Sequence, residues 1–243
     1  MCVKGKACIR DRRARRVDRF LKEHRHLADD YLDHPYFEVR ACAARYASLF
    51  KLVPLLDDPE PEVRAMATQR LPERRIRRMA KDDNSYVRRV AASRLSGGDL
   101  VAMLSDSEYS VRLTVVRKMP VDLLPLVLRD PDPEVRCWVA RRIAVNCLPD
   151  MCFDQDPMVR IEVAQRVPLA QLHLLAQDSD LRVRFAVVER LAEEDLAPFL
   201  KDPEPMIREV ARERIAMVPT LAHLLDVPGV RPAIFVLKKE PDQ

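Results

Sequence analysis

Cysteine thiolates are the side chains of this chain with the clearest potential for chemistry. Cys2 and Cys8 lie in a basic N-terminal segment, and Cys42 is the next cysteine along the chain. Thiolate is the soft ligand that iron–sulfur clusters select, and a [4Fe–4S] cluster normally takes four of them. Nearby positive charge lowers the pKa of a thiol and offsets the negative charge of a thiolate-bound cluster. Metal binding and simple burial are the two interpretations of these cysteines, because a reducing cytoplasm does not favour a disulfide framework.

Positive charge is concentrated at the N-terminus. Residues 1–26 contain ten Lys or Arg against three Asp or Glu, a local charge of +7, whereas the whole chain has a formal net charge of +4. The other 217 residues therefore sum to −3. Any affinity for a polyanion such as nucleic acid is expected at the N-terminus and not along the rest of the chain.

The segment that must position these cysteines is followed by a regular repeat. An apolar residue followed by Arg returns every 24 residues, eight times, from Val39-Arg40 to Ile207-Arg208. A fixed period of this kind marks a solenoid, in which each unit buries its apolar face by stacking on its neighbours. The chain is therefore expected to be a stack of eight repeats behind the cysteine-bearing segment.

Each repeat is expected to hold one α-helix and one shorter helical segment. Asp stands five residues before the Val position and is often followed by Pro, and both residue types favour a helix start. Val135, Val139 and Ile143 mark one face of a helix of about ten residues. After an interruption at residues such as Pro120, a second apolar set follows that is short enough to favour 3₁₀ geometry. The only β-like run is residues 233–236, so the expected fold class is an all-α solenoid without a sheet.

The 24-residue unit resembles the repeat of the leucine-rich repeat variant, or LRV, family. The likeness is carried by Asp-Pro, Val-Arg, a central Arg70-Leu71-Pro72 and a closing Leu-rich turn, and it spans about residues 33–225. The resemblance implies alternating α and 3₁₀ helices in a right-handed superhelix. It also implies a [4Fe–4S] cluster, since some LRV proteins carry one in a cysteine-bearing segment before the repeats.

Three domains follow: a cysteine-bearing segment at 1–32, the LRV repeats at 33–225, and a tail or cap at 226–243. Cys2, Cys8 and Cys42 are the candidate ligands, although the family pattern holds its cysteines before the repeats and only two of these precede them. Either an upstream stretch is missing from this chain, or Cys42 and a further ligand complete the site. The later cysteines are expected to play no part, since Cys152 replaces a Leu or Ala of other repeats and Cys137 and Cys147 lie four repeats away.

Two rows of basic residues run through the repeats. One follows the Val position, and the other lies six residues further on, at Arg70 and its equivalents. Rows of Arg can bind phosphates, but the Asp that recurs in each repeat supplies a carboxylate for every unit. We therefore expect Arg–Asp pairing that orders the stack, and not a nucleic-acid surface.

An apolar row is predicted on the other side of the repeat helices. The residue two after Val points about 160° from the centre of the core stripe at 100° per residue. Leu113, Ile161 and Phe185 occupy this position, with Trp138 beside it. These residues form either a binding patch for a protein partner or a face that the second helical segment covers.

The expected function is a non-enzymatic protein-interaction scaffold that carries a [4Fe–4S] cluster, with a redox or electron-transfer role. No nucleotide-binding loop, zinc-protease helix or serine nucleophile motif is present. The resemblance implies a redox or nitrogenase-related partner, linked to nitrogen fixation or iron–sulfur metabolism. The alternative is a solenoid that binds nucleic acid through its basic N-terminus. A cytoplasmic location is expected, because the chain has neither a secretory signal nor an apolar run of membrane-spanning length.

Overall fold

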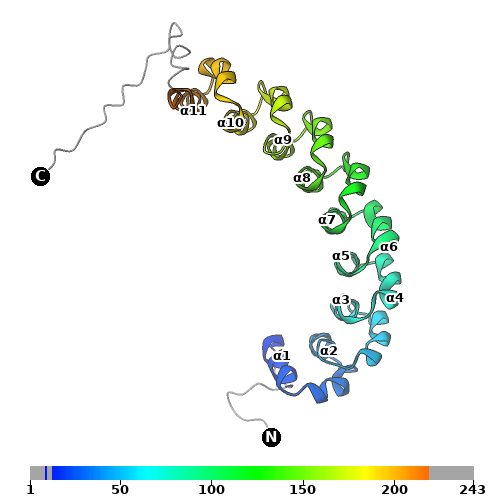
Figure 1. The fold of residues 1–243 in the computed structure, drawn as a ribbon. Coiled ribbons are helices and arrows are strands. Elements are labelled where there is room, and N and C mark those ends of the chain that lie inside the picture. Colours follow the sequence, from blue (N-terminus) through cyan, green and yellow to red (C-terminus); the bar gives the residue numbers. More distant parts are fainter. Residues whose placement is uncertain (1–8, 10–12, 219–243) are drawn as a thin grey trace, which may run out of the picture. The chain divides into compact units, whose positions relative to one another are not determined.

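The structure, a computed structural model, describes residue 9 and residues 13–218. This part of the chain is built from helices joined by short turns and holds no β-strand (Figure 1). The predicted tail at 226–243 and the β-like run at 233–236 lie outside the described residues. The chain divides into two compact units, residues 1–127 and residues 128–243, which are described separately below.

Unit 1 alternates α-helices with 3₁₀ helices. Figure 1 shows the α-helices of its repeats side by side in one layer, with the short second segments in another. Its elements, in chain order, are α1 (Ala14–Glu23), η1 (Arg25–Tyr31), α2 (Phe37–Ala44), η2 (Leu49–Lys51), η3 (Val53–Asp57), α3 (Pro61–Arg70), α4 (Glu73–Ile76), η4 (Arg77–Lys81), α5 (Ser85–Arg94), α6 (Gly97–Val101), η5 (Ala102–Ser105), α7 (Tyr109–Lys118) and η6 (Val121–Val127).

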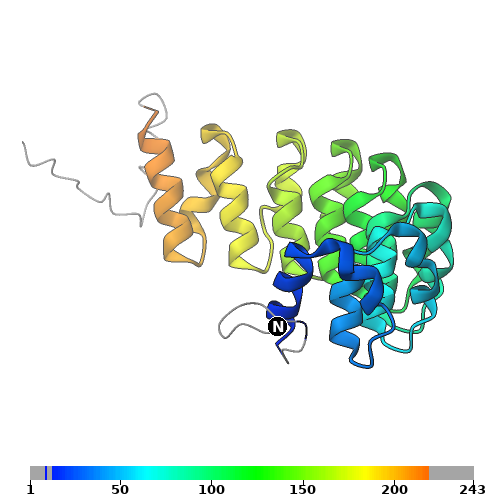
Figure 2. The same cartoon turned by 90° about the horizontal axis from the view of Figure 1, so that it is seen from below.

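Unit 2 continues the alternation, and its α-helices run side by side in Figure 2. Its elements are α8 (Pro133–Arg142), η7 (Val145–Met151), α9 (Pro157–Ala164), η8 (Leu169–Leu175), α10 (Leu181–Arg190), η9 (Glu193–Asp195), η10 (Ala197–Lys201) and α11 (Pro205–Ala216). The expected all-α fold of alternating α and 3₁₀ helices is thus confirmed. None of the described helices combines the length and the apolar character that a membrane crossing would need.

The helix α8 shows why the repeat sequence folds in this way. The side chain of Asp132 accepts a hydrogen bond from the backbone N–H of Glu134 at 2.9 Å, and Pro133 occupies the first turn. Val135 and Val139 are fully buried, as is Ile143 immediately after the helix. The predicted apolar face is therefore the one that packs into the core.

The second segments are mostly 3₁₀ helices because they are short. η6 and η7 have seven residues each and contain a proline, which removes one backbone donor. Two repeats differ, since α4 and α6 add a short α turn before η4 and η5. The second of these begins at Gly97, whose φ of 54° is in the left-handed region that glycine tolerates.

The first arginine row forms the predicted ion pairs. In each case the guanidinium Nε and Nη2 donate to the two carboxylate oxygens of the Asp that lies 18 residues later, in the next repeat, at 2.6–3.1 Å. The pairs are Arg40–Asp58, Arg64–Asp82, Arg88–Asp106, Arg136–Asp154, Arg160–Asp178 and Arg184–Asp202. Bidentate pairing of this kind is strong and directional, so it orders neighbouring repeats.

The remaining donor of these arginines is also occupied. Nη1 of Arg136 donates to the carbonyls of Asp130 and Pro131, at 2.7 and 3.2 Å. Its partner Asp154 also accepts from the backbone N–H of Asp156, at 2.9 Å. A guanidinium engaged on three sides within the protein has little capacity left for a phosphate, which supports the structural role expected for this row.

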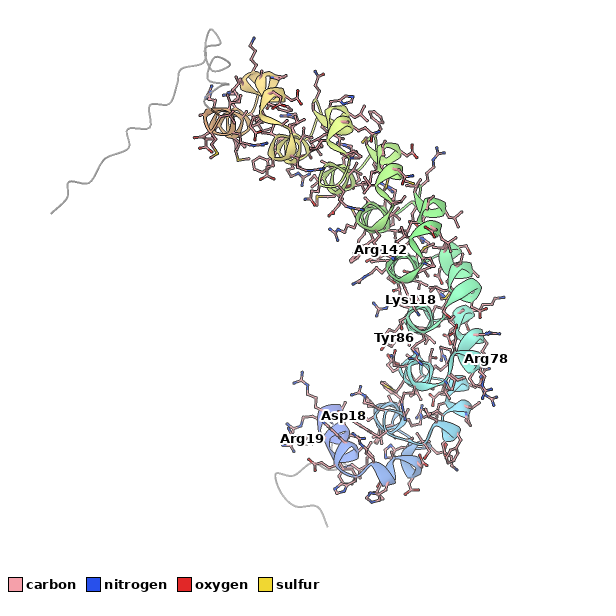
Figure 3. All side chains as sticks on the ribbon, viewed as in Figure 1. Asp18, Arg19, Arg78, Tyr86, Lys118 and Arg142 are labelled. Atoms are coloured by element: carbon pink, nitrogen blue, oxygen red, sulfur yellow. The ribbon has the colours of Figure 1, made fainter. Side chains whose placement is uncertain are left out.

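Residues of the second basic row bind backbone carbonyls, and one of them, Arg214, also pairs with the carboxylate of Glu193. Arg190 donates to the carbonyls of Ala164 and Val167 at 2.6 and 2.9 Å, where the helix α9 of the preceding repeat ends. Lys118, labelled in Figure 3, donates in the same way to Ser93 and Leu95. Helix C-termini leave carbonyls without helical partners and favour positive charge, so these residues cap the preceding helix. The pairing with Asp expected for this row is replaced at these positions by capping of helix ends.

Candidate functional site: the N-terminal cap and its cysteine

The described part of the N-terminal segment folds as a degenerate first repeat. Val17 and Leu21 of α1 are buried, and Ala28 of η1 is fully buried. α1 packs beside α2, and η1 also contacts α2. Terminal repeats of a solenoid protect the exposed end of the core, and α1 with η1 does so for unit 1.

Polar contacts join this cap to the first full repeat. Asp18 accepts hydrogen bonds from Nη1 of Arg45 and from the hydroxyl of Tyr46, both at 3.1 Å. Figure 3 shows Asp18 on the side of α1 that faces α2, and Arg19 on the outer side. Asp29 accepts from the backbone N–H and the hydroxyl of Ser48, and these bonds lower the pKa of Asp29. The cap therefore has a defined position on α2.

Cys42 lies in the contact between the cap and the first repeat. Its side chain on α2 is buried, and Sγ lies 3.7 Å from the carbonyl oxygen of Ala14, the first residue of α1. Burial raises the pKa of Cys42, and the negative charge of Asp18 acts in the same direction. The thiol is thus uncharged at neutral pH unless a metal ion displaces its proton.

Cys2 and Cys8 lie outside the described residues. Within the part of the chain that is described, no group of three or more His, Cys, Asp or Glu side chains is arranged to hold a metal. Ala14 is six positions after Cys8 along the chain, so the two positions are at most about 20 Å apart. The thiol of Cys42 lies beside the first residue of α1, and its role as a cluster ligand stays a prediction.

The other described cysteines lie far along the repeats, in unit 2. Cys152 is 1% exposed and packs as a small apolar side chain, as predicted. Cys137 is buried on α8, where desolvation raises its pKa to about 11. Cys147 is half-buried. Neither Cys137 nor Cys152 has the lowered pKa and open surroundings of a reactive thiol, since burial raises the pKa of both.

The predicted apolar row is half-buried. Leu113 lies on α7 in unit 1, and Trp138, Ile161 and Phe185 lie on α8, α9 and α10 in unit 2. Each side chain is neither fully covered nor fully exposed. The guanidinium of Arg141 lies 5.3 Å from the ring centroid of Trp138 and also pairs with Glu162. Binding of a protein partner at this row stays a prediction.

Two exposed methionines extend the apolar row in unit 2. Met158 on α9 and Met206 on α11 occupy the position before the Val of the repeat, and they are 46% and 52% exposed. Arg182 donates to the sulfur of Met158 from the equivalent position on α10, at 3.7 Å, so these positions are neighbours in space. Aligning this position across the repeats could have revealed them, since its other occupants are mostly polar or charged.

Comparisons with known proteins agree with the repeat and with the cysteine-bearing segment. Residues 1–30 match the family described as "LRV protein FeS4 cluster". An uncharacterized 27.7 kDa protein from the nifB 3′ region of Rhodobacter capsulatus is 51% identical over 55 residues, which cover 23% of this chain and only 22% of that protein. A solved structure described as a leucine-rich repeat variant with a novel repetitive protein structural motif is 37% identical, with a TM-score of 0.82 over 88% of this chain and 91% of that one. The chain therefore belongs to the leucine-rich repeat variant family.

Proposed function

We propose that this protein is a non-enzymatic, cytoplasmic interaction scaffold whose N-terminal segment carries a [4Fe–4S] cluster with a redox role. The observation that carries the proposal is the match of residues 1–30 to the FeS4 segment of LRV proteins, a stretch that includes α1 and most of η1 of the folded cap. When bound, such a cluster supplies one-electron transfer. The nifB-region relative supports a link to nitrogen fixation or iron–sulfur metabolism.

Cys2 and Cys8 are the ligands we propose from the matched segment. Cys42 is the third, although it lies beyond the matched residues, because its thiol faces Ala14 where the segment enters α1. Arg45 carries the positive charge that acts to lower the pKa of Cys42, against the effects of burial and of Asp18. Asp18, held by Arg45 and Tyr46, fixes the position of α1 relative to this thiol.

Anaerobic purification with iron and acid-labile sulfide analysis tests the cluster. We expect about four of each per chain and visible absorbance from sulfur-to-iron charge transfer. Cys8→Ser should remove iron and colour without loss of helical circular dichroism, because Cys8 precedes the first described helix. The matched control is Cys147→Ser, a half-buried thiol in unit 2, which should keep full iron content. Absence of iron and sulfide from the anaerobically purified wild-type protein would overturn the proposal.

Cys42→Ala separates a ligand from a packed thiol. Alanine leaves no unsatisfied polar atom in the buried site, so the variant is expected to fold. Loss of iron with intact helical circular dichroism supports ligation by Cys42. Full iron content in this variant assigns Cys42 to packing and requires other ligands beside Cys2 and Cys8.

We also propose the half-buried row in unit 2 as the protein-binding face of the scaffold. Trp138, Ile161 and Phe185, with the exposed Met158 and Met206, offer aromatic and flexible thioether groups of the kind that interfaces use. A photo-crosslinking amino acid at position 185 should yield a cross-linked partner that disappears when Met158 and Met206 are replaced by Glu. Cross-linking that persists in the double variant would contradict this face.

A further inference from the structure

The outer face of α1 carries a stripe of three cations. Arg15, Arg19 and Lys22 are exposed and are spaced by four and three residues, which places them on one side of the helix. Val17 and Leu21 occupy the opposite, buried side. We call this set, Arg15, Arg19 and Lys22, the α1 cation stripe.

The α1 cation stripe differs from the arginine rows of the repeats in having no carboxylate partner among the described residues. The nearby Asp18 is engaged by Arg45 and Tyr46 of the first repeat. Like charges at these spacings repel each other and destabilise a helix. Arginines of the two repeat rows, such as Arg184 and Arg190, are held by carboxylates or carbonyls of neighbouring repeats. The stripe, like other exposed cations such as Arg74, is available to a partner outside the chain, and its position on the N-terminal cap distinguishes it.

Unit 1 as a whole has an excess of positive charge, and unit 2 does not. The described residues 13–127 contain 22 Lys or Arg against 17 Asp or Glu, whereas residues 128–218 contain 13 against 17. The positive end of the protein is therefore the end that carries the cysteine segment. An anionic partner would be steered toward unit 1 and away from unit 2.

The surroundings of the stripe fit a compact acidic partner better than a long polyanion. Glu23 ends α1, and Glu38 on α2 and Glu62 on α3 are exposed in the neighbouring helices of the same layer. A nucleic-acid strand that continued along this layer would bring phosphates to these carboxylates. An acidic patch the size of one helix would meet the three cations and avoid them.

We propose that the α1 cation stripe is the docking surface for a small acidic electron-transfer protein, an inference that rests on the proposed [4Fe–4S] function. Arg15 is the second residue of α1, so a partner bound to the stripe stands beside the end of the cysteine-bearing segment. With a reduced flavoprotein as that partner, the flavin would give up one electron and the bound cluster would accept it, with no bond or proton changing place. Complementary surface charge suits such brief encounters because it raises the association rate more than the affinity.

Stopped-flow reduction of the cluster by an acidic flavodoxin in its fully reduced state tests the docking surface. The triple variant Arg15→Gln, Arg19→Gln, Lys22→Gln should react at least about tenfold more slowly than wild type at low salt and should lose most of the salt dependence. The matched control is Arg74→Gln, Arg75→Gln, Lys81→Gln, which removes the same charge from exposed residues of α4 and η4 that also lack an ion pair among the described residues. The control should stay within about twofold of wild type.

Iron analysis and circular dichroism of each variant keep the outcomes distinct. If wild type holds no cluster, the proposed function fails and the inference falls with it. If all proteins hold the cluster and the two triple variants react alike, the docking surface is wrong and the cluster stands. If the α1 variant instead loses binding of single-stranded DNA, measured by fluorescence anisotropy, while flavodoxin reduces it at the wild-type rate, the stripe serves nucleic acid and the acidic protein partner is overturned.

Discussion

Removal of Arg184 should be one of the most damaging single changes in unit 2. Arg184 donates to both carboxylate oxygens of Asp202, at 2.8 and 3.1 Å, and to the carbonyl of Asp178, at 2.7 Å. The Arg184 and Asp202 side chains are only 10% and 5% exposed. Burial acts to raise the pKa of Asp202, but the bonds from Arg184 and from the backbone N–H of Glu204 hold it below the ordinary 3.8. Asp202 is therefore charged at neutral pH and depends on its partners.

Arg184→Met keeps most of the side-chain volume and leaves this carboxylate without its counter-ion. Breaking a buried ion pair from one side typically costs about 3–5 kcal/mol. The lower end of that range, about 3 kcal/mol, is expected here because Asp202 keeps the hydrogen bond from Glu204. Replacing both partners, as Arg184→Met with Asp202→Leu, should recover much of the loss, since no charge then stays buried.

The chain supplies a matched control two residues away. Arg182 pairs with Asp180 at 2.7 Å, almost the same separation, but the Arg182 side chain is 54% exposed. Water and salt screen such a pair, so Arg182→Met should leave the stability unchanged within error. Comparing the two variants isolates the effect of burial from the effect of losing an arginine.

Urea unfolding followed by tryptophan fluorescence measures the difference. Trp138 is the only tryptophan of the chain and lies on α8, so its signal reports on unit 2. Arg184→Met should lower the free energy of unfolding and Arg182→Met should not, while the slope against urea stays constant. Equal midpoints for the two variants, or a double variant no more stable than Arg184→Met alone, would refute the assignment of Arg184 and Asp202 as a buried, mutually dependent pair.

Three further predictions follow from the same contacts. The pKa values of four carboxylates lie below 3.8 in the folded protein, so the unfolded chain binds more protons near that pH; they are Asp58, Asp82, Asp106 and Asp202. The free energy of unfolding should be at its full value above about pH 5 and should fall as the pH drops through the lowered pKa values. Urea midpoints that do not change between about pH 6 and about pH 3 would contradict this. Arg190→Met, which uncaps α9, should cost about 1.5–3 kcal/mol by urea unfolding, whereas the exposed neighbour Glu189→Gln should change little. Cys152→Ser should cost about 1–3 kcal/mol by burying a hydroxyl, with iron content unchanged, and a loss of iron would contradict its packing role.

The repeat could be predicted from the sequence because its period is unbroken. The Val-Arg pair, the Asp before it and the apolar spacing determine where α8 begins and which face is buried, and the structure agrees at Asp132, Val135 and Val139. The Arg–Asp pairs were also predictable, because a charge of each sign recurs once per unit. The capping by Arg190 was not, since its partners are backbone carbonyls, which every residue has.

The register of the cap helix α1 and the burial of the apolar row could not be predicted from the repeat pattern. Arg15 stands 24 residues before Val39, so the repeat signal stops there, and the buried residues of α1 are Val17 and Leu21 at a shifted register. For the row at Ile161 and its equivalents, the helical angle gives the direction of each side chain relative to the core stripe of its own helix. It does not give how much of that side chain the neighbouring elements bury. Half-burial of that row is a property of the stack and not of one repeat.

The contrast between paired and unpaired cations underlies our proposal of where this arginine-rich chain binds a partner. The total of 42 Lys and Arg suggests a polyanion-binding protein. However, arginines of the first row, such as Arg184, pair with Asp side chains, and residues of the second row, such as Arg190, bind carbonyls at helix ends. A cation that is held in an internal ion pair could bind a ligand only by giving up that pair, which would lower the stability of the fold. The loss expected for Arg184→Met measures this cost. No ion pair among the described residues engages the α1 cation stripe, and the stripe lies within residues 1–30, which match the FeS4 family. The local charge of residues 1–26 and the lack of ion-pair partners for the stripe agree, and both support our proposal of the N-terminal cap as the binding surface.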